Sequence, residues 1–471
     1  MSITLYNTMT RSKDPLQPLN DARVSLYTCG PTVYNYAHIG NLRTYVFEDV
    51  LKRALLYRGY EVNHVMNVTD VGHLVSDADE GEDKMTLGAQ REGKTVWEIA
   101  QFYWDAFRRD LERLNIIEPD VWCRATDHIQ EQIDQVRILE EKGFTYIIDD
   151  GVYFDTSKLP DYGKLARLDI AGLRAGARVE ITEGKRNYTD FALWKLSGEN
   201  SKRLMEWSSP WGVGFPGWHL ECSTMAMKYL GEHLDIHCGG VDHIAVHHTN
   251  EIAQAESALG HEWTNCWMHG EFLTMARSDD DAGGKMSKSS GEFLTMDVLV
   301  DKYGYDPMAY RYFLLGAHYR QQLAFSWDGL DAAASALTRI KRSVLDARGG
   351  YTGNEKPIAA CIGEFDDAVI DDLNMPRALA AMWKTAKTTD ASPGEIYATL
   401  LQMDRVLGLG FDEMTPGDAG ISDAEIDKLI DDRTAARAAK DYARGDEIRD
   451  QLIENGIEIM DSPEGTTWRR I

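Results

Sequence analysis

Four residues of this sequence, Cys29, Cys222, His247 and Glu251, together have the side-chain types of a mixed zinc shell. Cys29 ends an apolar run from Val24 that predicts a buried strand. His247 and Glu251 are four residues apart in a segment with helical patterning, so their side chains would lie about 5–6 Å apart on one helix face. Two thiolates, an imidazole and a carboxylate form a ligand set that suits tetrahedral Zn²⁺. The four residues therefore predict a zinc site.

The spacing of these residues is weak support by itself, because the cysteines are far apart and no C-x-x-C pair occurs. Taken singly, a cysteine is more often a small buried hydrophobe. A His/Glu pair at this spacing is more often a surface pair on a helix. The motifs beside the four residues are what favour the metal site.

The turn after the first predicted strand has features of a phosphate site. Residues 31–41 include His38 and lead into a helical pattern. The N–H groups and the positive dipole end of a helix N-terminus attract phosphate, and Gly40 would let a ligand approach the backbone. His38 could then donate to a phosphate oxygen. Standing alone, this turn would favour a buried histidine in an ordinary strand–helix connection.

A second motif, Lys-Met-Ser-Lys-Ser at residues 285–289, follows Gly283 and Gly284. Flanking glycines predict a mobile loop, and Lys285 and Lys288 would bring two cations to a polyphosphate. A single stretch of this kind would usually be a solvated surface loop. Its occurrence together with the His-Ile-Gly turn is far less likely by chance, which favours a role in polyphosphate binding.

Together these motifs resemble the class I aminoacyl-tRNA synthetases, and the metal-ligand segments are similar to those of the cysteinyl-tRNA synthetase family. The similar segments are residues 28–34, 217–223, 247–254 and 426–469, so the resemblance covers nearly the whole chain. The chain departs from the family at four places: Asn41 replaces the second histidine of the HIGH motif, Thr249 replaces a frequent Glu, Asp279, Asp280 and Asp281 extend the loop before Lys285, and Val71-Gly72-His73 is less acidic.

The resemblance implies a two-step reaction. The carboxylate of L-cysteine attacks the α-phosphate of Mg-ATP, and the cysteinyl group then passes to the 3′ end of tRNA(Cys). The implied catalytic residues are His38, Lys285 and Lys288. The implied ATP contacts are His38, Gly40, Asn41, Asp242 and Lys288, and Trp218 and His219 would wall the cysteine pocket. One zinc ion per chain, on Cys29, Cys222, His247 and Glu251, would select the substrate thiol.

Two other functions stay open. A cysteine ligase of the mycothiol pathway shares this catalytic half, but residues 421–471 argue against it, because such a ligase has no use for an anticodon-reading module. A non-catalytic, zinc-bearing RNA-binding paralogue is the other. Intact His38, Lys288 and metal ligands argue against that reading.

The composition predicts a cytoplasmic enzyme with no membrane contact, which we expect to be a monomer. The 471 residues are too many for one core, no apolar run approaches membrane-span length, and the first fifteen residues are too polar for a signal peptide. The six cysteines read as reduced thiols and metal ligands. A net charge of −26 conflicts with RNA binding unless local basic patches exist. Arg433, Arg437 and Lys440 form one candidate stripe, for which a solvated face is an equal alternative.

The expected fold is α/β: a doubly wound parallel nucleotide-binding sheet with an insertion, then an α-helical bundle and a small C-terminal anticodon-binding module. The expected domains are the catalytic domain at 1–115 and 203–270, a connective insertion at 116–202, a stem-contact region with the lysine loop at 271–326, the bundle at 327–412 and the C-terminal module at 420–471. Ligands should bind beyond the carboxyl ends of the parallel strands, near Cys29 and Asp242.

Overall fold

The computed structural model describes residues 2–72, 93–168, 184–198, 203–276, 294–415, 423–454, 457–462 and 465–470. Several residues of the sequence predictions lie outside this part of the chain. They are His73, Asp279, Asp280, Asp281 and the lysine loop with Lys285 and Lys288.

A five-stranded parallel sheet forms the centre of the molecule. Its strands lie in the order β12-β11-β3-β4-β5, and every neighbouring pair is parallel. The chain runs outward from β3 through β4 to β5, and later returns to the other side of β3 through β11 and β12. The predicted doubly wound sheet is therefore confirmed, with its topological switch point between β3 and β11. The strands are β3 (Arg23–Thr28), β4 (Glu61–Val68), β5 (Val121–Arg124), β11 (Leu234–Gly240) and β12 (Thr264–Gly270).

Helices cover both faces of this sheet, which explains why most residues of β3, β4 and β11 are buried, polar ones included. Leu26 of β3 packs into the core that contains helix α1, whereas the next residue, Tyr27, packs into a separate core with residues of α6 and α7. In β4, Met66 packs into the core with α1, and the adjacent Val65 packs into the core with α6 and α7. The covering helices are α1 (Ile39–Tyr57), α3 (Val96–Arg113), α6 (Trp218–Leu230) and α7 (His247–Leu259).

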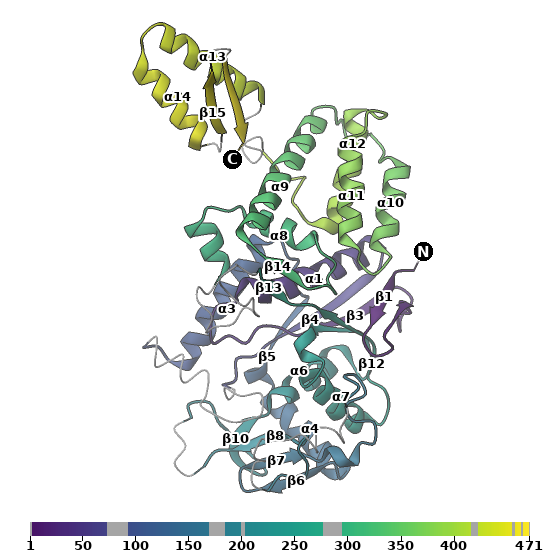
Figure 1. Cartoon of the computed structure of the whole chain (residues 1–471). Helices are drawn as coiled ribbons and strands as arrows, with labels where there is room; N and C mark the ends of the chain where they lie inside the picture. The colour runs from purple at the N-terminus through teal and green to yellow at the C-terminus, as the bar shows by residue number, and fades with distance from the viewer. Residues whose placement is uncertain are drawn as a thin grey trace.

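The insertion between β5 and α6 forms a second, antiparallel sheet at the opposite end of the molecule from the bundle (Figure 1). Its strand order is β6-β7-β8-β10-β9, and helix α4 (Ile129–Glu141) packs beside it. Buried Trp194 and Phe154 belong to its core. The strands are β6 (Thr145–Ile148), β7 (Gly151–Phe154), β8 (Phe191–Leu196), β9 (Trp207–Ser209) and β10 (Gly212–Pro216).

Short elements connect the central sheet to the bundle. An N-terminal hairpin pairs β1 with β2, and β13 pairs with β14 in parallel on either side of the segment that contains the lysine loop. These elements are β1 (Thr4–Asn7), β2 (Ser12–Pro15), β13 (Leu273–Met275), α8 (Pro307–Leu315) and β14 (Leu323–Phe325).

The helical bundle follows β14 and shares one core with α1. Its helices are α9 (Trp327–Arg348), α10 (Ala359–Val369), α11 (Met375–Ala386) and α12 (Pro393–Leu407). α12 begins with a capping box at Ser392 and ends at Gly408, which has a φ of 64°. Among the helices that the structure describes, none combines the length and the apolar character needed to cross a membrane.

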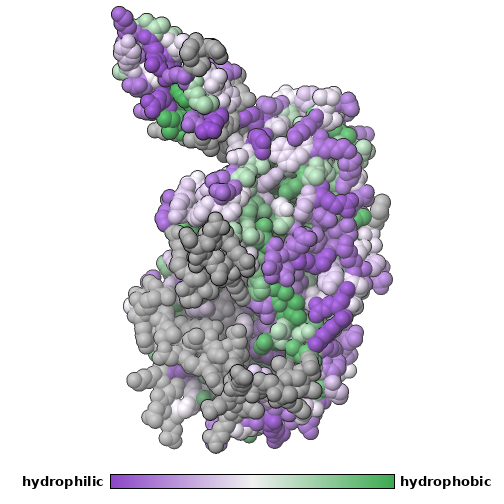
Figure 2. All heavy atoms as spheres, in the orientation of Figure 1, coloured by the Kyte–Doolittle hydropathy of each residue, from purple (hydrophilic) through white to green (hydrophobic). Residues whose placement is uncertain are grey.

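The C-terminal module stands apart from the body in Figure 1 and has its own small core of isoleucine and leucine side chains. It consists of α13 (Asp423–Ala438), α14 (Tyr442–Glu454), β15 (Ile457–Ser462) and β16 (Gly465–Arg470). Hydrophilic side chains dominate the face of this module shown in Figure 2.

The basic stripe considered for this module is wrong at Arg433. The Arg433 side chain is only 7% exposed and makes two hydrogen bonds, of 2.8 and 2.9 Å, to the carboxylate of Asp461. Arg437 binds the same carboxylate at 2.9 Å. The helix also ends before Lys440, so the pattern does not continue to Arg444. Two of the three expected cations therefore tie helix α13 to strand β15.

Candidate active site and metal centre

A cavity of about 310 Å³ opens at the switch point of the central sheet. One wall is the turn from Cys29 to His38, and another is formed by Gly240, Asp242 and His243 after β11. Helix α3 adds Tyr103 and Phe107. The expectation that ligands bind beyond the carboxyl ends of β3 and β11 thus matches the position of this cavity.

Two glycines beside the cavity are so tightly packed, Gly30 against backbone and Gly239 against histidine side chains, that a Cβ would not fit. A Cβ at Gly30 would lie 1.7 Å from the carbonyl oxygen of Asn67, and one at Gly239 would lie 2.6 Å from Nδ1 of His243. The Gly30 N–H donates to the side chain of Asn67 at 2.7 Å. These contacts hold the ends of β3, β4 and β11 together around the cavity.

The four predicted metal ligands meet at the base of this cavity. One ligand atom from each of Cys29, Cys222, His247 and Glu251 lies within 4.8 Å of all the others, and all four residues are buried. Cys29 follows β3, Cys222 lies on α6, and the other two lie on α7. Three elements that are remote in sequence therefore supply one compact set of donors.

The arrangement of these donors suits a tetrahedral zinc ion. Nε2 of His247 lies 3.0 Å from Oε1 of Glu251, yet within the described part of the chain no hydrogen bond of good geometry reaches this oxygen. Ligand atoms that share a zinc ion with bonds of about 2.1 Å are separated by roughly 3.4 Å. Two thiol groups, one imidazole and one carboxylate are also ligand types that zinc accepts.

Ionisation of the donors follows from their burial and their mutual contacts. Burial raises the pKa of the Cys29 thiol well above its ordinary value. Burial acts in the same direction on Cys222, but the hydrogen bond from Cys29 and the charge of His247 outweigh it and lower the pKa of that thiol. His247 is likewise opposed by burial, but Glu251 and Cys222 raise its pKa to about 10. Without a metal the set holds a proton on His247, which metal binding would release.

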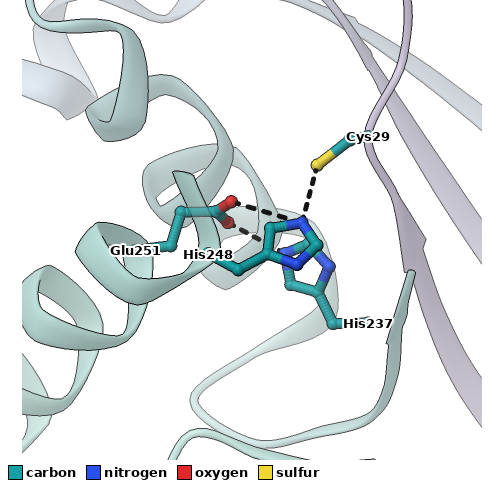
Figure 3. A group of neighbouring side chains, drawn as sticks. All are labelled: Cys29, His237, His248 and Glu251. Carbon is teal, nitrogen blue, oxygen red and sulfur yellow. Dashed lines mark hydrogen bonds and ion pairs between the residues drawn. The ribbon is translucent and has the colours of Figure 1, made fainter. Parts of the chain in front are cut away.

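Sequence reasoning missed a layer of histidines around these donors. Nε2 of His237 donates a hydrogen bond to Oε2 of the Glu251 carboxylate at 2.8 Å. Nε2 of His248 lies 3.3 Å from the sulfur of Cys29 (Figure 3). Nδ1 of His248 lies 2.8 Å from Nε2 of His269. Cys29, His237, His248 and Glu251 form a second group of donors within 4.8 Å of one another, which shares two members with the first. The available signal was His237 in the predicted buried strand that became β11, since a buried polar side chain needs a partner.

The predicted phosphate turn caps helix α1. The ring of His38 is its N-cap, because Nδ1 accepts a hydrogen bond from the Asn41 N–H at 3.0 Å and the Asn41 side chain accepts one from the His38 N–H. An accepting Nδ1 places the proton of a neutral ring on Nε2, where it can serve as a donor. Both His38 and Asn41 line the cavity. Gly40 lies between them, and a Cβ there would lie 3.0 Å from the His38 ring.

The remaining predicted residues differ in position. Trp218 lines the cavity and packs against His247 with ring centroids 4.4 Å apart. Asp242 also lines it and is exposed. His219 is buried and is not among the cavity-lining residues; its Nδ1 lies 2.9 Å from Nδ1 of His247. His219 thus contacts a metal-ligand candidate rather than the open cavity.

A polar chain at the end of β4 was also missed. The Asn67 side chain donates to Thr69 at 3.0 Å, and the Thr69 hydroxyl donates to Glu221 at 2.9 Å. Asn67 and Thr69 both line the cavity. Their position predicts contacts with polar groups of a bound substrate.

Comparisons with known proteins agree with this architecture. The family model described as the class I (C) tRNA synthetase catalytic domain matches residues 15–335, and that of the cysteinyl-tRNA ligase anticodon binding domain matches residues 422–469. The structure is similar to a ternary complex of Agrobacterium radiobacter K84 LeuRS with tRNA and LeuAMS, with a TM-score of 0.59 at 13% identity, covering 86% of this chain and 87% of that chain. It is also similar to Mycobacterium tuberculosis methionyl-tRNA synthetase bound by methionyl-adenylate, with a TM-score of 0.54 at 18% identity, covering 83% and 90%.

The fold and the matching catalytic domain define the class of this protein as a class I aminoacyl-tRNA synthetase. The chain is 52% identical to a cysteine–tRNA ligase of Burkholderia lata over 99% of this chain and 96% of the relative. It is 43% identical to the cysteine–tRNA ligase of Treponema denticola over the full length of both. The chain belongs to the cysteinyl-tRNA synthetase family.

Proposed function

We propose that this protein is a cysteine–tRNA ligase that activates L-cysteine with Mg-ATP and transfers it to tRNA(Cys). The observation that carries the proposal is the Cys29, Cys222, His247 and Glu251 set at the base of a cavity bounded by the His38 turn. Family membership over the full chain supports the same conclusion. All proposed site residues lie in one chain, so the proposed working unit is a monomer.

Zinc is the proposed metal, held by those four residues. When bound, it would supply a soft Lewis-acid site that accepts the substrate thiolate far better than a hydroxyl group. The surrounding histidines orient its ligands: His237 holds Oε2 of Glu251, which leaves Oε1 directed at the other donors. His219 contacts the ring of His247 on the side away from Glu251, through Nδ1. Such outer contacts fix the direction of each ligand.

The other residues act on ATP and cysteine by positioning and by stabilising charge. His38 would donate from Nε2 to a phosphate oxygen, while Gly40 and Asn41 present the first turn of α1 to the phosphates. Asp242 would grip the nucleoside or the amino group of cysteine from the opposite wall. Trp218 would close the side chain pocket, and Lys285 and Lys288 would neutralise the pyrophosphate that leaves.

Residues 420–471 are proposed to read the anticodon, and the stem-contact region and the bundle to guide the tRNA toward the cavity. The domain bounds given above remain part of this proposal, except that β5 belongs to the central sheet and β9 and β10 to the sheet of the insertion. A cysteine ligase of the mycothiol pathway is disfavoured, because the chain retains a match to an anticodon binding domain at residues 422–469.

The experiment that tests the proposal has two stages. Cysteine-dependent ATP–pyrophosphate exchange measures the first step, and charging of tRNA with cysteine measures the second. A chain that ends near residue 420 should keep exchange and lose most charging, because every residue assigned to the first step precedes that point. If the full chain exchanges with cysteine but charges no tRNA, and instead transfers cysteine to an amino sugar, the proposal is wrong in its second half.

A further inference from the structure

Helix α3 carries aromatic side chains from the cavity to the surface. Tyr103 and Phe107 line the cavity and are buried, whereas the neighbouring Phe102 is 39% exposed. Tyr36, from the cavity turn, lies with its ring centroid 5.9 Å from that of Phe102 and 5.0 Å from that of Tyr103. Phe102 and Tyr103 are 5.1 Å apart. The rings of Tyr36, Tyr103 and Phe102 therefore form a continuous edge-to-face cluster that begins in the cavity and ends in solvent.

A cation lies at the outer end of this cluster. Nζ of Lys94 is 3.9 Å from the centroid of the Phe102 ring. The nearby carboxylate of Glu98 accepts hydrogen bonds from the N–H and the hydroxyl of Thr95, at 2.8 and 2.9 Å, and so completes the cap of α3. An exposed ring beside a cationic side chain is the combination that binds single-stranded nucleic acid, because the ring stacks on a base and the cation meets the backbone.

We propose that Tyr36, Phe102 and Lys94, here called the aromatic rim, bind an unpaired nucleotide next to the 3′ end of the acceptor tRNA. The inference rests on the proposed function and adds where the acceptor strand lies. Because the terminal ribose must reach an adenylate inside the cavity, the nucleotides before it must cross the mouth of that cavity. The aromatic rim is continuous with the lining of the mouth, so a base takes the place of Lys94 on the face of Phe102, and the displaced Lys94 meets a phosphate. Stacking accepts any base, so the aromatic rim contributes affinity without selecting sequence.

The test measures charging of two substrates by four proteins. The substrates are intact tRNA and the same tRNA with an abasic residue at one unpaired position near its 3′ end. The proteins are wild type, Phe102→Ala, Phe102→Tyr and Phe102→Leu. Loss of one base–aromatic stack should raise the KM for intact tRNA by about 5- to 150-fold in Phe102→Ala. Phe102→Tyr keeps an aromatic face and should stay close to wild type, whereas Phe102→Leu keeps the apolar packing but should behave like Phe102→Ala.

The abasic substrate separates stacking from a merely structural effect. Wild type should lose a similar factor when the stacked base is removed, and Phe102→Ala should lose little more on that substrate, because both changes remove the same contact. A matched control is Trp97→Ala: Trp97 is 52% exposed on the same helix but points about 140° away from Phe102. Its KM for tRNA should not change.

Three results would overturn the proposal. The first is an unchanged KM for tRNA in Phe102→Ala, and the second is an equal KM for Phe102→Leu and Phe102→Tyr. The third is that the abasic residue and Phe102→Ala raise the KM independently, so that their factors multiply, at every tRNA position tested. Exchange with cysteine is measured on each protein to correct for changes in the first step. If wild type charges no tRNA at all, it is the proposed function that fails; if wild type charges normally and the Phe102 series is flat, only the aromatic rim is wrong.

Discussion

Replacement of Asp372 should loosen the helical bundle from the catalytic domain. Asp372 is fully buried in the loop between α10 and α11, and its carboxylate accepts hydrogen bonds from the Tyr6 N–H at 2.8 Å and the Tyr319 hydroxyl at 2.7 Å. Nε of Arg320 donates to the other oxygen at 2.7 Å. One side chain therefore joins the bundle to the N-terminal hairpin and to the segment before β14.

This contact continues toward the active site. Carbonyl groups of Phe272 and Gln321 accept hydrogen bonds from Arg43, which lies on α1 shortly after His38. Gln321 directly follows the residue that Asp372 binds. The start of α1, the segment around β13 and the bundle are thus held by one hydrogen-bonded network.

The cost of Asp372→Ala can be worked out from these contacts. Two buried donors, the Tyr6 N–H and the Tyr319 hydroxyl, would lose their acceptor, at about 1–3 kcal/mol each. Asp372 has a φ of 58°, and alanine in that left-handed conformation costs roughly 1–2 kcal/mol more. The free energy of unfolding should therefore fall by about 3–8 kcal/mol. Asp372→Asn keeps an acceptor and tolerates the left-handed backbone, so it should lose only about 1–3 kcal/mol.

Urea unfolding followed by tryptophan fluorescence measures this loss as a lower midpoint of the transition. The adjacent Asp371 is a matched control, because it forms ion pairs with Lys13 and Arg377 at the surface. Asp371→Ala should cost at most about 1 kcal/mol. If Asp372→Ala lowers the midpoint no further than Asp371→Ala does, the reasoning from the buried network is refuted.

Three more predictions follow from the site and from helix α3. Purified protein should contain about one zinc ion per chain and Cys222→Ser should lose most of it, because a serine hydroxyl is a much poorer zinc ligand than a thiolate; metal analysis that finds none in active protein would contradict the assignment. Lys288→Ala should lower kcat for pyrophosphate exchange by about 10²–10³ with a smaller change in the KM for ATP, and a rise in KM alone would assign Lys288 to ground-state binding. Burial, with a smaller contribution from Asp297, raises the pKa of Asp110 to about 7, so between about pH 4 and 7 the folded state keeps a proton that the unfolded state has lost. The free energy of unfolding should therefore fall as the pH rises through this range, by at most about 1.4 kcal/mol per pH unit. The urea midpoints of Asp110→Asn should not show this fall.

The local elements of the fold could be predicted from the sequence because their signals are local. The apolar run at β3, the helical pattern after the phosphate turn and that around His247 depend on neighbouring residues alone. The proximity of Cys29 and Cys222 in the fold could be predicted from the neighbouring motifs and the family resemblance, but not from their spacing in the sequence. The lysine loop lies outside the described residues, so the roles of Lys285 and Lys288 stay predictions.

What could not be predicted depends on partners remote in sequence. Nδ1 of His269 lies 2.7 Å from the Thr8 hydroxyl, and its Nε2 contacts His248. No residue near His269 in the sequence predicts either contact. Arg433 was read as part of an exposed stripe because a helical pattern cannot show that Asp461 folds back onto it. The hydrogen-bond partners of these buried polar residues are remote in sequence, so they are known only from the folded structure.

The ratio of kcat/KM for cysteine to that for serine in pyrophosphate exchange tests the central claim most directly. A hydrophobic pocket separates substrates that differ by one small group by only about 10²-fold, whereas a site that bonds the distinguishing group can reach roughly 10⁴–10⁵. With zinc held by Cys29, Cys222, His247 and Glu251, we expect a ratio of at least about 10⁴ in the metal-loaded protein. Comparable values for the two amino acids, or no exchange with cysteine, would contradict the account.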